Sequence, residues 1–119
     1  MIQASCHCGN VQIVLPKLTD TATECNCSIC FRYGARWGYF TEKDLTISVG
    51  SMGVQSYTHG DRMIAFVHCR QCGCLTHYTS VNTGPDSRVA VNYRMIDSGL
   101  HNKLRIRHFD GADSWTFLD

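Results

Sequence analysis

The stretch Cys69-Arg70-Gln71-Cys72-Gly73-Cys74 contains the spacing that decides the fold. Two thiolates separated by two residues can bind one tetrahedral zinc ion across a tight turn, and Gly73 lets that turn adopt a positive φ. Such a site needs two more ligands, and the Cys-x-Cys turn of Cys6-His7-Cys8-Gly9 has the reach to supply them. The spacing therefore predicts a closed structural zinc site that joins the N-terminal segment to the middle of the chain, with the ligands Cys6, Cys8, Cys69 and Cys72.

A second cysteine run, Cys25-Asn26-Cys27-Ser28-Ile29-Cys30, offers three thiolates. Three ligands leave one position of a tetrahedral zinc ion open, and an open position is typical of catalytic zinc sites. Three thiolates give such a site a charge of about −1, so it favours capture of an exogenous thiolate over activation of water. We therefore expect two zinc ions per chain, the second one catalytic and held by Cys25, Cys27 and Cys30.

Other interpretations of the second run remain open at this point. A closed site would take its fourth ligand from Cys74, His7, His68 or His77. A dithiol redox centre or an iron–sulfur cluster would use the same thiols. Cys74 itself is interpreted as a small buried residue beside the Cys69–Cys72 turn, with a role as ligand as the alternative.

Strand signals dominate the rest of the chain, whereas helical signals are weak. Alternating or aromatic runs bounded by turn residues predict strands at Val11–Leu15, Trp37–Phe40, Leu45–Val49, Val54–Thr58, Arg62–His68, Leu75–Thr79, Arg88–Asn92, Leu104–Phe109 and Trp115–Leu118. The tripeptide His59-Gly60-Asp61 predicts a hairpin turn, and Thr41–Asp44 and Ser98–Lys103 predict single helical turns. The expected fold is mostly β, with several short antiparallel sheets stapled by zinc.

Length and charge narrow the class of protein. The 119 residues fit a single zinc-binding domain over residues 1–119. A net charge of +1 gives no strong attraction to nucleic acid or to an anionic membrane. We see neither a signal peptide nor the roughly 20 apolar residues of a transmembrane helix, so we expect a cytoplasmic protein. In that reducing compartment, clustered cysteines are typical of metal ligands more than of disulfides.

The segments Ser5–Val11, Cys25–Cys30 and Cys69–Cys74 together resemble the glutathione-dependent formaldehyde-activating enzyme family, which includes centromere protein V. The resemblance covers about Ser5 to His77. It implies an all-β fold called a β-tent, a structural zinc on the first four cysteines named above and a catalytic zinc on the other three. It also implies condensation of glutathione with formaldehyde to S-(hydroxymethyl)glutathione, or the reverse cleavage of the carbon–sulfur bond.

One segment departs from the formaldehyde-activating members. After Cys30 the chain reads Phe31-Arg-Tyr-Gly-Ala-Arg-Trp-Gly-Tyr-Phe40, where those members have a continuation closer to Arg-x-x-Gly-Ala-Pro. The chain looks more like a bacterial subgroup with an aromatic strand at this place. This departure weakens the assignment of glutathione and formaldehyde as the substrates. It leaves the expected zinc ligands unchanged.

Several residues beside the cysteines are candidates for substrate contacts. Glutathione carries two carboxylates, so Arg32, Arg36 and Arg70 are candidate partners, with a solvated or structural role as the alternative. Trp37, Tyr39 and Phe40 line a pocket or fill the core. The Tyr33 hydroxyl reaches the substrate if the segment after Cys30 is helical. His68 and His77 are candidate proton donors or buried, hydrogen-bonded residues, and His59 and His101 are expected at the surface.

Three functions follow from these features. The leading one is a zinc-dependent carbon–sulfur lyase or synthase acting on a glutathione-type thiol adduct, with a small thiol such as glutathione as its partner. The alternative from another class is a non-catalytic, zinc-stabilised binding module. A thiol- or metal-buffering protein is the third.

Overall fold

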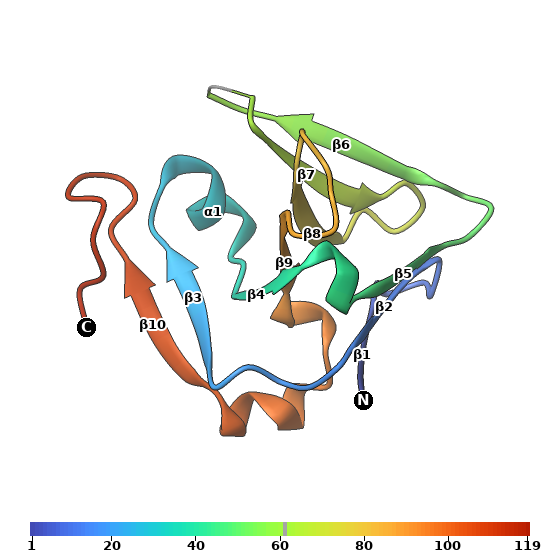
Figure 1. Ribbon diagram of the computed structural model, residues 1–119, viewed down its shortest axis with the longest axis horizontal. Helices are drawn as coiled ribbons and strands as arrows, with labels where there is room; N and C mark the ends of the chain where they lie inside the picture. Colours follow the sequence, from blue (N-terminus) through green and yellow to red (C-terminus); the bar gives the residue numbers. More distant parts are fainter. Residues whose placement is uncertain (61) are drawn as a thin grey trace.

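The computed structural model describes residues 1–60 and 62–119, and its ten strands form two sheets (Figure 1). The smaller sheet has the order β1-β2-β5, and the larger one has the order β10-β3-β4-β9-β8-β7-β6. The strands are β1 (Ile2–Ser5), β2 (Val11–Leu15), β3 (Thr21–Cys25), β4 (Trp37–Thr41), β5 (Thr46–Val49), β6 (Val54–Thr58), β7 (Ile64–Cys69), β8 (Leu75–Ser80), β9 (Arg88–Asn92) and β10 (Arg105–Phe109). The helical elements are α1 (Ser28–Tyr33) and the 3₁₀ turns η1 (Glu42–Asp44), η2 (Tyr93–Met95) and η3 (Ser98–Lys103).

The predicted mostly-β fold is confirmed, and most predicted strands lie within two residues of their predicted bounds. Both single helical turns are also found, as η1 and η3. The hairpin between β6 and β7 is confirmed by antiparallel pairing from Val54↔Cys69 to Thr58↔Ala65, although Asp61 of its turn lies outside the described residues.

Three features differ from the sequence prediction. β1 and β3 were not predicted, because runs such as Thr-Ala-Thr-Glu-Cys in β3 lack the bulky residues that favour strands. The predicted strand Trp115–Leu118 is wrong apart from one bridge, Phe109↔Phe117. Trp115 has a φ of 58°, in the left-handed region, and a strand cannot continue through that conformation.

One strand pair is parallel, and it brings the end of the chain to the second cysteine run. β10 pairs with β3 from Arg105↔Thr21 to Phe109↔Cys25, whereas the other pairs among the described strands are antiparallel. A parallel pair requires a long connection, and here that connection contains all the strands from β4 to β9. Figure 1 shows β10 beside β3, with the C-terminal segment along the outer side of β10.

The larger sheet has an apolar core cluster on each of its two faces. Neighbouring residues of a strand point to opposite sides, so one strand contributes to both clusters. One face packs with the smaller sheet in a core cluster that includes Ile13, Leu15, Val91 and Tyr93. The opposite face, beside α1, forms a second cluster of Cys30, Ala35, Trp37, Phe66, Leu75, Tyr78 and Ala90. A third, small cluster contains Cys6, Val11 and Cys69. No helix among the described residues is long and apolar enough to cross a membrane.

We expect Gly38→Ala to destabilise the fold, because the added Cβ would overlap the buried ring of Tyr93 on the face toward the smaller sheet. Overpacking of this kind costs about 1–3 kcal/mol in free energy of unfolding, which urea denaturation measures. Gly84→Ala is the control, since its Cβ would meet Ser87 Oγ at an ordinary 3.6 Å. Equal stability of the two variants would contradict the close packing of β4 against Tyr93.

Candidate metal centres

Four thiols meet at the junction of the two sheets and form the first cysteine group, which comprises Cys6, Cys8, Cys69 and Cys72. Cys6 and Cys8 lie in the turn between β1 and β2, and Cys69 and Cys72 lie at the turn between β7 and β8. All four sulfurs lie within 4.8 Å of one another, with Sγ–Sγ distances of 3.7 Å for Cys6–Cys8 and 3.5 Å for Cys8–Cys69.

These distances fit a metal ion and exclude disulfides. A tetrahedral zinc ion with Zn–S bonds of about 2.3 Å places its sulfur ligands about 3.8 Å apart. A disulfide would require an S–S distance of about 2.05 Å, and all eight cysteines are free thiols. The first group can therefore hold a metal ion in four-sulfur coordination.

Backbone and side-chain N–H groups point at these sulfurs. Val11 N donates to Cys6 Sγ at 3.2 Å, and Cys72 N donates to Cys69 Sγ at 3.4 Å. The two turns can direct their N–H groups in this way because Gly9 and Gly73 have φ values of 82° and 80°. Hydrogen bonds of this kind stabilise the charged form of a thiol, which is the form that binds metal.

The crowding of the thiols separates their pKa values. Burial raises the pKa of Cys72, but backbone N–H groups of Cys74 and Cys8 outweigh this effect and lower it to about 5. The Asn10 backbone lowers the pKa of Cys8, but desolvation and the surrounding thiols outweigh it and raise the pKa to about 12. Thiols this close ionise together only when a cation compensates their charge, as a metal ion does.

Asn10 is a part of this centre that the sequence analysis missed. Its Nδ2 donates to Cys69 Sγ at 3.4 Å and to Gly53 O at 2.9 Å, and its backbone O accepts from Gly50 N at 2.7 Å. It therefore connects the first group to the turn between β5 and β6. Cys74 packs beside Cys6 and Cys72, as expected, and does not belong to the four-sulfur group.

The second cysteine group comprises Cys25, Cys27 and Cys30, whose sulfurs also lie within 4.8 Å of one another. Cys25 ends β3, Cys27 is the N-cap of α1, and Cys30 lies within α1. Cys27 N donates to Cys25 Sγ, and Cys30 N donates to Cys27 Sγ, both at 3.5 Å. The turn into α1 thus collects three thiols from six consecutive residues around one point.

In the described part of the chain, no histidine, cysteine or acidic residue joins the second group as a fourth ligand. The four residues considered as fourth ligands lie elsewhere. Cys74 interacts with Cys72 and with the backbone of His7 at the first group. His68 Nε2 bonds to Tyr33 Oη at 3.0 Å, and His77 Nδ1 bonds to Thr76 Oγ1 at 2.8 Å, where burial lowers the pKa of His77 to about 4.

The indole N–H group of Trp37 bears on whether the second group fits a metal ion, because a buried donor favours a charged thiolate nearby. Trp37 Nε1 is buried and has no conventional hydrogen-bond partner among the described residues. Burial raises the pKa of the Cys30 thiol, and the Trp37 side chain acts against this by donating toward its sulfur. An otherwise unpaired donor aimed at a buried sulfur fits a metal-bound thiolate better than a neutral thiol.

The position of Trp37 argues against its predicted contact with substrate. The side chain is 1% exposed and packs edge-on against Tyr78, with ring centroids 4.8 Å apart. Trp37 is therefore a core residue under the second group. Tyr39, two residues along the same strand face, is exposed instead.

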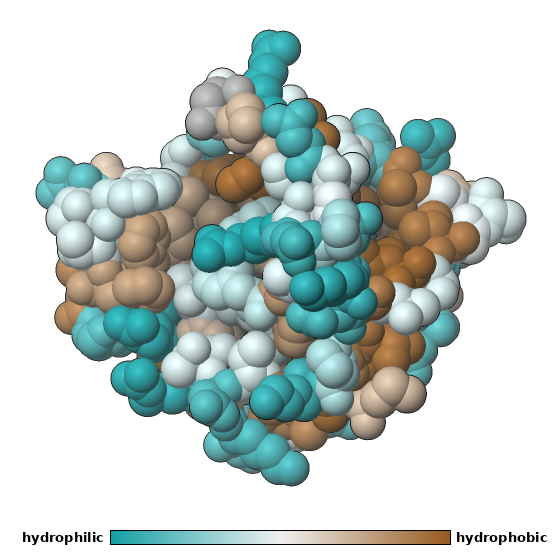
Figure 2. All heavy atoms as spheres, viewed as in Figure 1, coloured by the Kyte–Doolittle hydropathy of each residue, from teal (hydrophilic) through white to brown (hydrophobic). Residues whose placement is uncertain are grey.

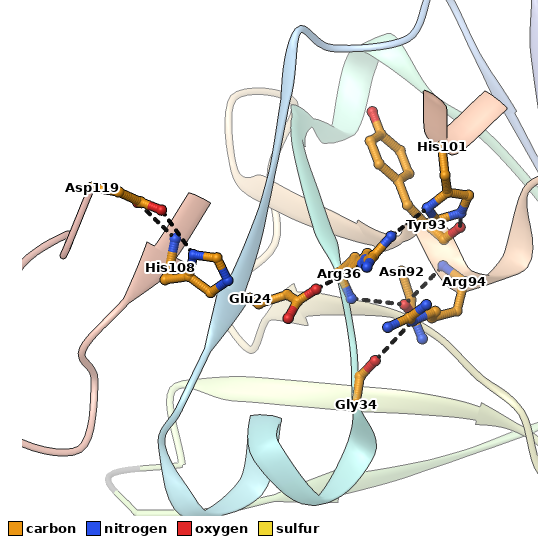
Figure 3. Close-up of polar contacts among 9 residues, drawn as sticks. All are labelled: Glu24, Gly34, Arg36, Asn92, Tyr93, Arg94, His101, His108 and Asp119. Carbon is orange, nitrogen blue, oxygen red and sulfur yellow. Dashed lines mark hydrogen bonds and ion pairs between the residues drawn. The ribbon is translucent and has the colours of Figure 1, made fainter. Parts of the chain in front are cut away.

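Arg36 is also displaced from its predicted role. Its Nε forms an ion pair with Glu24 Oε2 at 2.7 Å, and its Nη1 contacts His101 Nδ1 at 3.1 Å (Figure 3). Glu24 precedes Cys25 on β3, so the two side chains point to opposite faces of the sheet. Because the Arg36 guanidinium pairs with Glu24, it lies on the face of the sheet away from the second group.

Arg32, Arg70 and Tyr33 lie at the surface or beside α1. Arg32 donates to Ser28 O at 2.9 Å and borders an open hollow of about 210 Å³ with Tyr57 and His59. Arg70 donates to Val54 O at 3.3 Å, next to the first group. Tyr33 lies in the helix α1, three positions after Cys30. The segment after Cys30 is therefore helical, which is the condition under which the Tyr33 hydroxyl was expected to reach the substrate.

The end of the chain completes the surroundings of the second group, and the sequence analysis missed it. Asn26 lies between two of the cysteines, and its Nδ2 donates to Asp110 Oδ1 at 3.0 Å while its Oδ1 accepts from Ala112 N at 3.0 Å. A Cβ placed on Gly111 would lie 2.7 Å from Cys25 Sγ. The Asp110-Gly111 pair signals a turn, but only the parallel β3–β10 pairing reveals its neighbour.

Comparison with known proteins identifies a family and a similar solved structure. The family described as "Glutathione-dependent formaldehyde-activating enzyme" matches residues 1–110. A crystal structure of a Rhodobacter sphaeroides protein superposes with a TM-score of 0.68 and 29% sequence identity, covering 82% of this chain and 89% of that one. The residues matched by the family, 1–110, include all the cysteines of both groups.

We expect Arg36→Ala to lower the free energy of unfolding by about 1 kcal/mol, because it removes a half-buried ion pair and a contact to His101. The metal content of the second group should stay unchanged. Lys43→Ala is the control, since it removes an exposed ion pair with Asp86 and should change stability by less than about 0.5 kcal/mol. Urea denaturation and elemental analysis measure both quantities, and loss of metal from Arg36→Ala would contradict this placement.

Proposed function

The chain belongs to the glutathione-dependent formaldehyde-activating enzyme family, and from this membership we propose that it is a zinc-dependent enzyme that makes or cleaves the carbon–sulfur bond of a glutathione-type thiol adduct. The observation that carries the proposal is the difference between the two cysteine groups. The first has four sulfurs, and the second has three, with no fourth protein ligand among residues 1–60 and 62–119. Zinc sites with four protein ligands are typically structural, whereas sites with three protein ligands keep one position open for a substrate.

The two groups take different roles in this proposal. Cys6, Cys8, Cys69 and Cys72 hold a structural zinc between the two sheets of one zinc-binding domain spanning residues 1–119. Cys25, Cys27 and Cys30 hold a second zinc. That zinc supplies an open coordination position, which lowers the pKa of an incoming thiol and keeps it as the thiolate.

The chain's own residues prepare the second site for this chemistry. Trp37 Nε1 is buried in the same core cluster as Cys30, and the Trp37 side chain favours the charged form of that thiol. The turn N–H groups of Cys27 and Cys30 hold the other two sulfurs in place. The protein therefore orients three thiolates toward one point before the substrate arrives, which reduces the reorganisation that binding requires.

The reaction needs no net proton from the protein, because the thiol releases one proton when it forms the thiolate, and that proton restores the group that protonates the product. The thiolate sulfur attacks the aldehyde carbon, the C–S bond forms, and the carbonyl π electrons become an alkoxide that takes one proton. Tyr33 is our candidate donor, because it follows Cys30 by one turn of α1 and its Oη bonds to His68 Nε2 at 3.0 Å. His68 is placed to return a proton to Tyr33, and the reverse reaction uses the same groups in the opposite direction.

We expect wild-type protein to carry two zinc ions, and Cys27→Ser to lose one while remaining folded. Cys69→Ser should lower the free energy of unfolding by more than about 3 kcal/mol, because metal binding at a structural site contributes directly to folding. Cys74→Ser is the matched control and should keep both ions, since its sulfur lies outside both groups. Native mass spectrometry gives the stoichiometry and urea denaturation the stability. Loss of both ions from Cys27→Ser would show that the sites are not independent.

A glutathione adduct tests the open position directly. The zinc-loaded protein should bind one glutathione in native mass spectra, and neither S-methylglutathione nor the Cys27→Ser variant should give the adduct, because both lack one partner of the zinc–sulfur bond. Exchange NMR with ¹³C-formaldehyde should then show faster formation of S-(hydroxymethyl)glutathione than in the absence of protein. Two bound zinc ions with no adduct and no rate increase would favour the non-catalytic binding module instead.

A further inference from the structure

After β10 the chain forms a closed loop, Asp110–Thr116, which we name the C-terminal strap. Its two ends are joined by backbone hydrogen bonds, Asp110 N to Thr116 O and Trp115 N to Asp110 O, both 2.8 Å. Asp110 Oδ2 accepts from Ser114 N and Oγ, and its pKa is lowered by the Asn26 amide first and by these Ser114 contacts. The strap therefore has a defined shape of its own.

The strap is attached to the second cysteine group at its centre. Three hydrogen bonds join Asn26 to the strap and to Phe109, the residue before it. Asn26 N donates to Phe109 O at 3.2 Å, and Asn26 Nδ2 donates to Asp110 Oδ1 at 3.0 Å. Asn26 Oδ1 accepts from Ala112 N at 3.0 Å. Figure 1 shows this segment beside β3 and the start of α1. In Figure 2 the same corner, at the left, carries pale and brown side chains toward the centre of the molecule.

Gly111 brings the strap into contact with the cysteines. The position of a Cβ on this residue lies 2.7 Å from Cys25 Sγ, 3.3 Å from Cys27 Cβ and 3.5 Å from Trp115 Cζ3. Only glycine fits so close to the sulfur without a shift of one of them. The indole edge of Trp115 and the Cys25 sulfur thus border the same small space.

Trp115 adopts an unusual backbone conformation at the closure of the strap. Its φ of 58° is strained for a bulky residue, and such strain persists where the surroundings impose it, often at functional sites. The side chain is 70% exposed, so burial does not compensate the strain. Its ring meets the ring of Phe109 edge-on, with centroids 5.0 Å apart.

We propose that the C-terminal strap forms one wall of the open position at the second cysteine group, and that Trp115 contacts the part of the thiol substrate beyond its sulfur. Trp115 then favours extended thiols such as glutathione over small thiols that cannot reach the ring. The identification of the ligand as a thiol rests on the proposed function. The position of the strap beside the second cysteine group does not depend on that function. The family match ends at residue 110, so Gly111 and Trp115 are features outside it.

Thiol discrimination tests the role of Trp115. Calorimetric titration of zinc-loaded protein should show that Trp115→Ala weakens glutathione binding by about tenfold and changes 2-mercaptoethanol binding by less than about twofold. Leu118→Ala is the matched control, since this side chain is also exposed, at 64%, and lies outside the strap. Equal changes for the two thiols in Trp115→Ala, or none, would overturn the selectivity assigned to Trp115.

Zinc release tests the wall without any thiol substrate. A chromophoric chelator should remove zinc from the second group at least about fivefold faster in Gly111→Ala than in wild type, because the added Cβ displaces the Cys25 sulfur or the strap. Gly84→Ala should release zinc at the wild-type rate. Unchanged release from both Gly111→Ala and Trp115→Ala would overturn the wall. Absence of thiol binding by wild type, with accelerated release in Gly111→Ala, would refute the proposed function and keep the wall.

Discussion

The four sulfurs of Cys6, Cys8, Cys69 and Cys72 are the constraint on which the rest of the structure depends. They come from two turns far apart in the sequence, one in the smaller sheet and one in the larger. Thiols within 4.8 Å of one another repel as they ionise, so their closeness requires a compensating cation. Once this junction is fixed, the apolar faces of β2 and β9 meet over Tyr93, and the larger sheet can curve away with its other face free for α1.

The two cysteine groups differ in chemistry because they differ in local structure. The first uses two glycine-containing turns that approach from opposite sides, so four sulfurs surround one point. The second uses a single strand end and the first turn of a six-residue helix, so its three sulfurs approach from one side. A single segment of that length cannot surround an ion, and no other described segment brings a ligand to the remaining side. In the proposed zinc site, this topology would leave one coordination position open.

The sequence predicted what depends on neighbouring residues. Chelating pairs, glycine turns and strand alternation are local, so the cysteine groups and most strands were identified correctly. The long-range grouping of Cys6 and Cys8 with Cys69 and Cys72 was also predicted, because a pair of thiols leaves a zinc ion in need of two more ligands. Contacts set by long-range strand pairing were missed. Arg36 follows Cys30 closely in sequence, but alternation and the Glu24 ion pair place it on the other face. The parallel pairing of β10 with β3, which brings Gly111 to Cys25, has no local signal, and the apolar run at Trp115–Leu118 imitates a strand.

The arrangement separates the part of the molecule that binds metal from the part that can vary. The thiols of the two groups lie on β3, α1 and the two turns, where the sulfurs of Cys6, Cys25, Cys27 and Cys69 accept hydrogen bonds from N–H groups of their own segments. Among the described residues, the strap contributes no ligand to either group, and its hydrogen bonds to the second cysteine run go to Asn26. A change in the strap beyond Gly111 can therefore alter which substrate fits while the sulfur geometry stays the same. A family that keeps its ligands and varies this loop would change specificity without rebuilding its metal centres.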